Sequence, residues 1–240
     1  MYEPRFYRNQ TLAKDLYSFE VRIKETDLFI SADRDLKAVA HELVYFYRGL
    51  VEEFIGRFPL FKETLVPIEV PKDAPDIVKS MADAAKLAGV GPMAAVAGAI
   101  AEYVGRGLLE YSDEVIVENG GDIFIKTERD RKMGIYASES PLSNRIAITI
   151  TPNDTPLGIC TSSGTVGHSL SFGKADAVVI LSGSTSLADA TATKVGNIIH
   201  SKDDIRKAIE FAQSVPGIEG AIIVVGDGLG GWGKFEFIPA

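Results

Sequence analysis

The chain has 240 residues, 46% of them hydrophobic, and a formal net charge of −8 at pH 7. This apolar content is enough for a sizeable core and excludes a disordered chain. The acidic balance argues against a nucleic-acid binder or a binder of anionic membranes, because no basic excess is present to displace counterions from phosphates. One cysteine and three histidines exclude an intrachain disulfide and argue against a Cys/His zinc cluster.

The cytoplasm is the compartment that fits the sequence best. The first residues are charged and lack an apolar run with a small-residue cleavage site, so we expect no secretory signal. The longest uncharged apolar run, residues 87–101, is shorter than the roughly 20 residues that span a bilayer. We therefore expect a buried helix there and no membrane partner.

The first predicted elements are a β-hairpin and a long amphipathic helix. Apolar and polar residues alternate over residues 17–23, and residues 28–30 form a second apolar run after a polar turn, which predicts paired strands. Apolar residues recur at helical spacing over residues 36–54. Residues 58–75, which contain four prolines, are predicted to form an extended connection with buried apolar side chains.

Two helices rich in small residues follow. The first is predicted to start at Asp76, after a proline, and to end at Gly89, where a left-handed cap suits glycine. The second, residues 92–109, carries almost only small residues on its first turns, so that another backbone or a ligand can approach closely. Tight packing on a sheet and a phosphate bound at the helix N-terminus both explain this composition.

The rest of the chain reads mainly as strands joined by turns. The predicted strands are residues 114–117, 123–125, 133–137, 145–151, 175–181 and 220–225, and the predicted helices are residues 186–199 and 203–213. This pattern predicts an α+β fold in one domain, residues 1–240, with an antiparallel-rich mixed sheet covered by helices. A small-residue helix leading to an apolar strand with a Gly/Asp turn occurs twice, which duplication of a half-domain would explain.

A glycine turn lies between two of these strands. Gly120 and Gly121, flanked by Asn119 and Asp122, predict a tight hairpin turn. Glu118 and Asp122 are paired carboxylates beside a kink in a buried sheet, and such charges need a partner. We therefore treat Asp122 as a candidate catalytic residue.

A hydroxyl-rich stretch follows a later strand. Thr161, Ser162, Ser163 and Gly164 offer hydroxyls and backbone amides to a diphosphate or a ribose. An ordinary polar turn has the same composition. His168 lies shortly after it and is a candidate general base, ligand contact or hydrogen-bonded turn residue; glycine and serine surround it, which favours a functional role.

A carboxylate and a hydroxyl share one face of the helix predicted at residues 186–199. Asp189 and Thr193 are four residues apart, and this pair of hard oxygen donors suits Mg²⁺. Asp189 also fits a residue near a helix start that free amides stabilise. Cys160, at the end of an apolar strand, is either an inert buried cysteine or a reactive thiol, and a thiol enzyme using Cys160 and His168 is one hypothesis.

Four of these segments together resemble the ApbE-like superfamily, the FAD:protein FMN transferases. Residues 188–193 are similar to the A-D-A-L-A-T metal-binding segment of that family and residues 119–123 to its G-G-D-I strand. Residues 161–164 resemble its T-S-G turn, and residues 98–101 resemble the start of its G-A-I-A-K helix. The order matches as well, and the likeness to a short, uncharacterised branch covers nearly the whole chain.

The resemblance implies that FAD or FMN binds against the sheet as a cofactor. It implies Mg²⁺ bound to the diphosphate and held by Asp189, Thr193 and the Ala99 carbonyl. The residues implied in flavin or nucleotide binding are Asn119, Gly120, Gly121, Thr161, Ser162, Ser163 and Gly164. In transferases of this family the metal activates the diphosphate, FMN passes to a threonine of an acceptor protein, and AMP leaves.

This chain departs from the family pattern in three respects. Glu102 stands where the family has a lysine, the H-x-x-D-P segment after the T-S-G turn is missing, and we expect no export signal, which many family transferases have. These departures motivate a second hypothesis, a non-catalytic accessory protein in sulfur or cofactor metabolism that keeps the fold. Expected partners are a flavin or nucleotide and an acceptor protein, and a homodimer is compatible with either hypothesis.

Overall fold

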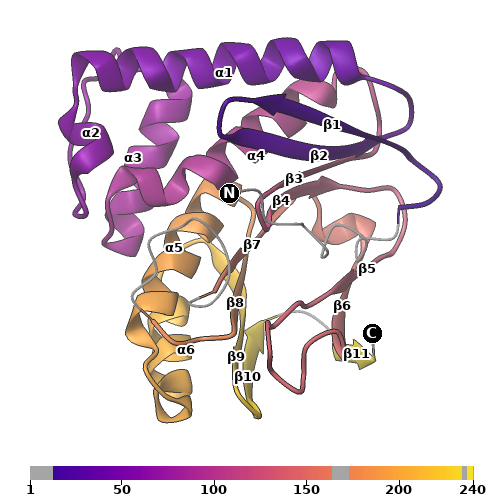
Figure 1. Ribbon diagram of the computed structural model, residues 1–240, viewed down its shortest axis with the longest axis vertical. Helices are drawn as coiled ribbons and strands as arrows, with labels where there is room; N and C mark the ends of the chain where they lie inside the picture. Colours follow the sequence, from indigo (N-terminus) through magenta and orange to yellow (C-terminus); the bar gives the residue numbers. More distant parts are fainter. Residues whose placement is uncertain (1–12, 164–172, 234–236, 240) are drawn as a thin grey trace.

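A computed structural model describes residues 13–163, 173–233 and 237–239 (Figure 1). Its main sheet has eight strands in the order β1-β2-β3-β4-β7-β8-β9-β10, and a smaller sheet has three in the order β11-β6-β5. Each of the pairings within these described strands is antiparallel. The predicted α+β class with an antiparallel-rich sheet is confirmed.

The strands lie close to their predicted positions because most of them carry an uninterrupted or alternating apolar pattern. Their bounds are β1 Tyr17–Ile23, β2 Thr26–Ala32, β3 Val115–Asn119, β4 Asp122–Lys126, β5 Arg131–Gly134, β6 Ile146–Ile150, β7 Leu157–Ser162, β8 Ala177–Ser182, β9 Ile218–Val225, β10 Gly228–Gly233 and β11 Phe237–Pro239. After the last predicted core strand, β9, the chain turns back and forms β10, a glycine-rich strand at the edge of the main sheet.

The helices agree with the sequence prediction at most of their ends. Their bounds are α1 Lys37–Arg57, α2 Leu60–Glu63, α3 Asp76–Ala88, α4 Val96–Leu108, α5 Thr185–Ile198 and α6 Ile205–Ser214, with a 3-10 helix, η2, at Pro92–Ala95. Gly89 has the left-handed conformation expected of the residue that ends α3, with φ of 71°. The predicted helix 92–109 is divided into η2 and α4, so its first turn is wound more tightly than expected.

The main sheet separates two apolar cores. Alternate strand residues such as Val117 and Phe124 pack against the helices, whereas Ile116 and Ile125 face the opposite core with β5 and β6. Figure 1 shows the helices gathered on one side of the main sheet and β5, β6 and β11 on the other. The helix-facing side is the one on which the candidate site lies.

Residues 58–75 differ from the prediction. They include the short helix α2, and Leu60, Leu65 and Val66 are each at least 60% exposed. The expected extended connection is therefore wrong for this short helix, and the expected burial is wrong for these three side chains. Ile68 and Val70 are partly buried against the helix-side core, so the expectation holds for part of the segment. Phe61 is fully buried and packs edge-on against Phe54, with ring centroids 5.1 Å apart, so one aromatic side chain anchors the segment while its neighbours stay outside.

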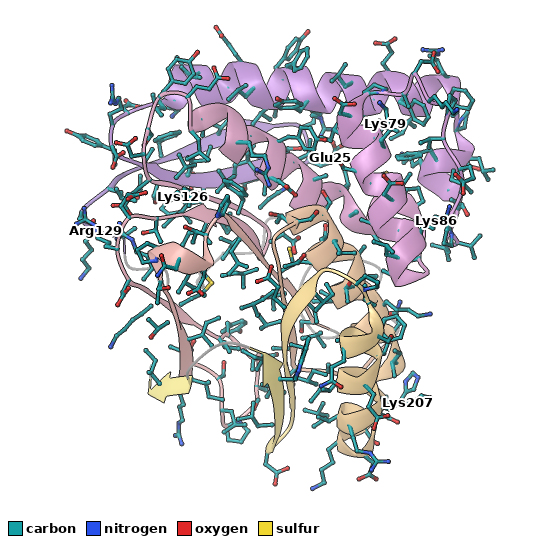
Figure 2. All side chains as sticks on the ribbon, turned by 180° about the vertical axis from the view of Figure 1, so that it is seen from behind. Glu25, Lys79, Lys86, Lys126, Arg129 and Lys207 are labelled. Carbon is teal, nitrogen blue, oxygen red and sulfur yellow. The ribbon has the colours of Figure 1, made fainter. Side chains whose placement is uncertain are left out.

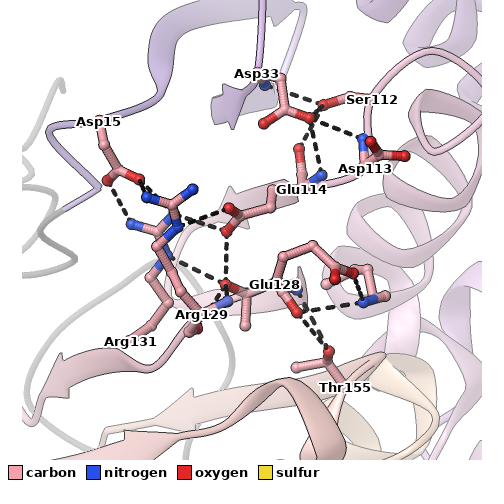
Figure 3. Close-up of polar contacts among 11 residues, drawn as sticks. Asp15, Asp33, Ser112, Asp113, Glu114, Glu128, Arg129, Arg131 and Thr155 are labelled. Carbon is pink, nitrogen blue, oxygen red and sulfur yellow. Dashed lines mark hydrogen bonds and ion pairs between the residues drawn. The ribbon is translucent and has the colours of Figure 1, made fainter.

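A buried ion-pair cluster closes the open end of the β3–β4 hairpin (Figure 3). Arg131 and Glu114, both nearly inaccessible, pair at 2.7 Å, and Asp15 accepts from Arg131 at 2.6 and 3.0 Å. Thr127 donates to Glu114 at 2.7 Å. Arg131 is buried although it stands in a run of charged residues, 128–132, because its ion-pair partners lie far away in sequence.

Charged side chains cover the outer surface. Seen from behind in Figure 2, Lys86 and Lys207 lie at the outer edge of the helical layer. Within the described residues, no single helix is long and apolar enough to cross a membrane; α3 together with Pro92–Leu108 meets the criteria of length and composition only as a pair bent by 106°.

The two parts of the main sheet share an element order. β1 and β2 precede helices that lead to β3 and β4, and β7 and β8 precede helices that lead to β9 and β10. This shared order is compatible with duplication of a half-domain but does not confirm it. The duplication stays a prediction.

Candidate functional site

The β3–β4 turn is built as its sequence indicates. Asn119 pairs with Asp122, which leaves Gly120 and Gly121 as the two-residue loop, with φ of 69° and 107°. These positive values favour glycine and explain the pair. The Asn119 side chain donates to the Ala97 carbonyl at 3.0 Å, so the turn is tied to the start of α4.

Asp122 points toward the helices from the first position of β4. It is 8% exposed, and its register partner on β7 is Cys160. Burial raises the pKa of Asp122 to about 7; the adjacent Cys160 side chain and the Thr161 amide oppose this rise, and the Glu118 charge adds to it. A buried carboxyl group of this kind is typical of functional sites.

Cys160 is completely buried between Asp122 and the start of α5. Its sulfur lies 3.4 Å from the Thr185 carbonyl oxygen, to which the thiol donates. Burial, followed by the charges of Asp122 and Asp189, raises the pKa of the thiol well above its usual range. Reactive cysteines need an accessible thiolate, so this environment favours an inert thiol and gives the thiol-enzyme hypothesis no support.

Asp189 reaches the same place from α5. Its Oδ2 accepts from the Gly98 amide at 2.8 Å, so the carboxylate is bound at the N-terminal turn of α4. Burial and then the charge of Asp122 raise the pKa of Asp189 well above its usual range, against the opposing effect of the Gly98 and Ala97 amides. One interpretation of the sequence was that free amides at the start of its own helix stabilise Asp189. The amides that do so belong to α4, the neighbouring helix.

The donor set fits a hard cation that brings further ligands of its own. Among the described residues, the groups that shift the pKa values of Asp122 and Asp189 are carboxylates, a thiol and backbone amides, and none of these is a cationic side chain. Two nearby desolvated carboxylates are offset by a divalent ion. Over the described ranges, no three His, Cys, Asp or Glu side chains converge to hold a metal by themselves, so water or phosphate oxygens would complete the coordination.

The predicted hydroxyl-rich stretch lies at the end of strand β7. Thr161 and Ser162 end β7 instead of forming a turn, and the Thr161 amide donates to Gly121 at 3.2 Å, which brings them beside the glycine turn. Ser163 follows the strand and is partly buried. Gly164 and His168 lie outside the described residues, so their predicted roles stay predictions.

Two predicted metal ligands lie on the helices of the site. Thr193 is partly buried, one turn beyond Asp189 on α5. Ala99 follows Gly98 inside α4, where helical geometry directs its carbonyl toward the amide four residues later. If the Ala99 carbonyl binds a metal, it must do so while it also accepts the helical hydrogen bond. Thr193 and Ala99 both stay predicted ligands.

Glu102 has a role that sequence reasoning did not find. It is 7% exposed, and its Oε2 accepts from the amides of Thr185 at 2.8 Å and Ser186 at 3.3 Å. Its Oε1 accepts from Arg106 at 2.9 Å. Glu102 thus accepts the free amides at the N-terminus of α5. In the sequence, the arginine four residues later is a feature that points to a paired Glu102.

Comparisons of sequence identify relatives over nearly the whole chain. The family described as AbpE bacteria matches residues 9–232. A "UPF0280 protein" of Methanocella arvoryzae is 42% identical over 221 residues, which cover 90% of this chain and 89% of that protein. A "UPF0280 protein" of Methanopyrus kandleri is 41% identical over 222 residues, 90% of each chain.

Comparisons of structure identify the same fold at low sequence identity. The apo flavinyl transferase ApbE of Pseudomonas stutzeri has a TM-score of 0.60 at 13% identity, with 93% of this chain and 94% of that chain covered. The ApbE protein of Thermotoga maritima has a TM-score of 0.55 at 12% identity, with 90% and 96% covered. At this identity the likeness establishes the fold alone.

Proposed function

Since this chain belongs to the AbpE bacteria family and has the ApbE fold, we propose that it binds a flavin nucleotide, FAD or FMN, together with Mg²⁺. The binding place lies between the Gly120–Gly121 turn, the end of β7 and the face of α5 that carries Asp189. The observation that carries this proposal is the convergence of Asp122 and Asp189 on the buried Cys160, which is the register partner of Asp122 and whose pKa both charges raise. Within the described part of the chain, no cationic side chain is among the groups that shift the pKa values of these two carboxylates.

The proposed metal site uses oxygen ligands. The Gly98 amide binds Asp189 Oδ2, so Asp189 would offer the metal its other carboxylate oxygen. Thr193 would offer its hydroxyl. Asp122, on strand β4, contributes a second negative charge to the site. Mg²⁺, when bound, supplies positive charge that offsets both carboxylates and a diphosphate. An acidic protein thereby holds an anionic ligand.

The finer proposal is transfer of FMN to an acceptor protein. In that step an acceptor hydroxyl oxygen forms a bond to the FMN phosphorus, the P–O bond to the departing AMP breaks, and the hydroxyl proton passes to a base. We propose Asp122 as this base, because burial raises its pKa to about 7, and His168 is the second candidate. The proposed setting is the cytoplasm, as the single cysteine suggests.

The test is a titration of FAD, followed by flavin fluorescence, with and without Mg²⁺, combined with an assay of AMP release. We expect Mg²⁺-dependent binding to the wild type that Asp189→Asn weakens at least tenfold. The matched control is Asp83→Asn, an exposed aspartate on α3 that leaves binding unchanged. Absence of FAD binding by the wild type, or unchanged binding by Asp189→Asn, contradicts the proposal.

A non-catalytic accessory role is the second candidate, and Glu102 favours it. A carboxylate occupies the α5 N-terminus near the place where the family resemblance led us to expect a cationic phosphate contact. A protein that binds FAD and Mg²⁺ without forming AMP in a single turnover fits this role. Formation of AMP at a rate above the uncatalysed reaction excludes it.

A further inference from the structure

We propose that Glu102 is a positioning residue for the metal site, because it fixes the first turn of α5 against α4 and thereby holds Asp189 in place. The inference rests on the proposed function, since it concerns the site where Mg²⁺ and FAD are proposed to bind. Glu102 itself lies on α4 and reaches the site through Thr185 and Ser186 of α5.

The two helices exchange carboxylates. Glu102 of α4 accepts from the Thr185 amide at 2.8 Å, and Asp189 of α5 accepts from the Gly98 amide at 2.8 Å. On each helix the residue that accepts follows the residue that donates by four positions, which is one helical turn. Each helix therefore stabilises the positive end of the other, and the two contacts form a reciprocal pair.

The helix backbones touch between these two contacts. A Cβ at Gly98 would lie 2.4 Å from the Thr185 carbonyl oxygen and 2.8 Å from Asp189 Cβ. No side chain separates the helices at this level, so a movement of Thr185 is transmitted directly to Gly98. The position of Asp189 depends on both hydrogen bonds and on this contact.

Loss of Glu102 leaves the Thr185 and Ser186 amides buried without a protein acceptor, which is unfavourable. The helix itself persists, because the Ser184 side chain also accepts from the Leu187 amide at 3.4 Å. The first turn of α5 moves toward another acceptor, and Asp189 lies one turn further on. The expected consequence is misplacement of Asp189 in a protein that remains folded.

The experiment measures the Mg²⁺ concentration that gives half-maximal FAD binding in the wild type, Glu102→Ala, Glu102→Gln and Glu114→Gln. Alteration of residues that orient metal ligands typically costs 10- to 100-fold in metal affinity, so we expect Glu102→Ala to raise this concentration by about 10- to 100-fold. Glu102→Gln keeps one oxygen for the Thr185 amide and is expected to recover most of the wild-type value.

Glu114→Gln controls for general loss of stability. Glu114 is also buried and also paired with arginine, at 2.7 Å, but it lies at the opposite end of the β3–β4 hairpin. We expect it to lower the melting temperature without changing the Mg²⁺ midpoint. Circular dichroism of each variant identifies any that fails to fold. If Glu102→Ala does, Glu102→Asp takes its place, because its shorter side chain keeps the charge but withdraws the acceptor of the Thr185 amide; a wild-type Mg²⁺ midpoint in that variant overturns the inference.

Two results overturn this inference alone: a wild-type Mg²⁺ midpoint in folded Glu102→Ala, or an equal shift in Glu114→Gln. Failure of the wild type to bind FAD with Mg²⁺ is a different result, because it overturns the proposed function and this inference with it. A shift in Glu102→Ala that Glu102→Gln largely reverses supports the positioning role.

Discussion

Replacement of Gly98 by alanine tests the direct contact between α4 and α5. The added Cβ would lie 2.4 Å from the Thr185 carbonyl oxygen and 3.0 Å from its carbonyl carbon. Unstrained carbon contacts need roughly 3.5 Å, so the helices must separate by about 1 Å. Both neighbours are backbone atoms, and no side-chain rotation relieves the overlap.

The expected change in the free energy of unfolding follows from two unfavourable contributions and one favourable contribution. Overpacking in a core costs about 1–3 kcal/mol, and lengthening of the 2.8 Å bond from Gly98 to Asp189 weakens a hydrogen bond to a charged group. The higher helix propensity of alanine returns about 1 kcal/mol. We therefore expect Gly98→Ala to lower the free energy of unfolding by about 1–3 kcal/mol and to weaken Mg²⁺-dependent FAD binding.

Gly49→Ala is the matched control. Gly49 lies in the middle of α1, is exposed, and has no atom within 4 Å of an added Cβ. Here only the propensity effect acts, so we expect stabilisation by up to about 1 kcal/mol. Urea unfolding followed by circular dichroism compares the two variants, and a Gly98→Ala protein as stable as Gly49→Ala would refute the close helix contact.

Four further predictions concern buried charges and the thiol. Arg131→Met leaves Glu114 without its main buried partner and should lower the free energy of unfolding by about 3–5 kcal/mol in urea titrations. Burial raises the pKa of Glu114, but hydrogen bonds from Arg131 and Thr127 outweigh it and hold the pKa below 4.5. The stabilisation from Glu114 is therefore complete above pH 4.5 and lost as the pH falls through the folded-state pKa, so the stability difference between wild type and Glu114→Gln should narrow in acid. Cys160 should react with a thiol reagent only as fast as the protein unfolds; fast labelling of the native protein would contradict its burial. Glu102→Lys, which introduces the lysine of the ApbE-like pattern, should melt at a lower temperature than Glu102→Ala, because it places a cation at the positive end of α5.

Local features of the fold were predictable from the sequence because their causes are local. The Gly120–Gly121 turn needs positive φ, and Gly89 needs the left-handed conformation that ends α3, so glycine at these positions identifies both features. Alternating and continuous apolar runs likewise located most strands. The segment after α1 was predicted less well, because the full burial of Phe61 allows its neighbours Leu60 and Leu65 to stay exposed.

The interior of the candidate site depends on long-range register, which the sequence does not display. Asp122 faces Cys160 because β4 pairs with β7, and Asp189 approaches both because α5 packs on that sheet. The burial of Arg131 has the same origin, since its partners are Asp15 and Glu114. The local residue pattern singled out Asp122 and Asp189, and the resemblance to a family added support, whereas only the fold accounts for their proximity.

The position of Glu102 changes how an anionic ligand would be recognised. Glu102 occupies amides at the N-terminus of α5, and Asp189 occupies an amide at the N-terminus of α4. Helix N-termini commonly bind phosphates through such amides, but here protein carboxylates already hold them. With Asp122 nearby, the local field opposes a diphosphate. The proposed recognition of a flavin dinucleotide at this site therefore requires the cation, because carboxylates already hold the Thr185, Ser186 and Gly98 amides. The cation would also compensate for the glutamate that stands in place of the family lysine.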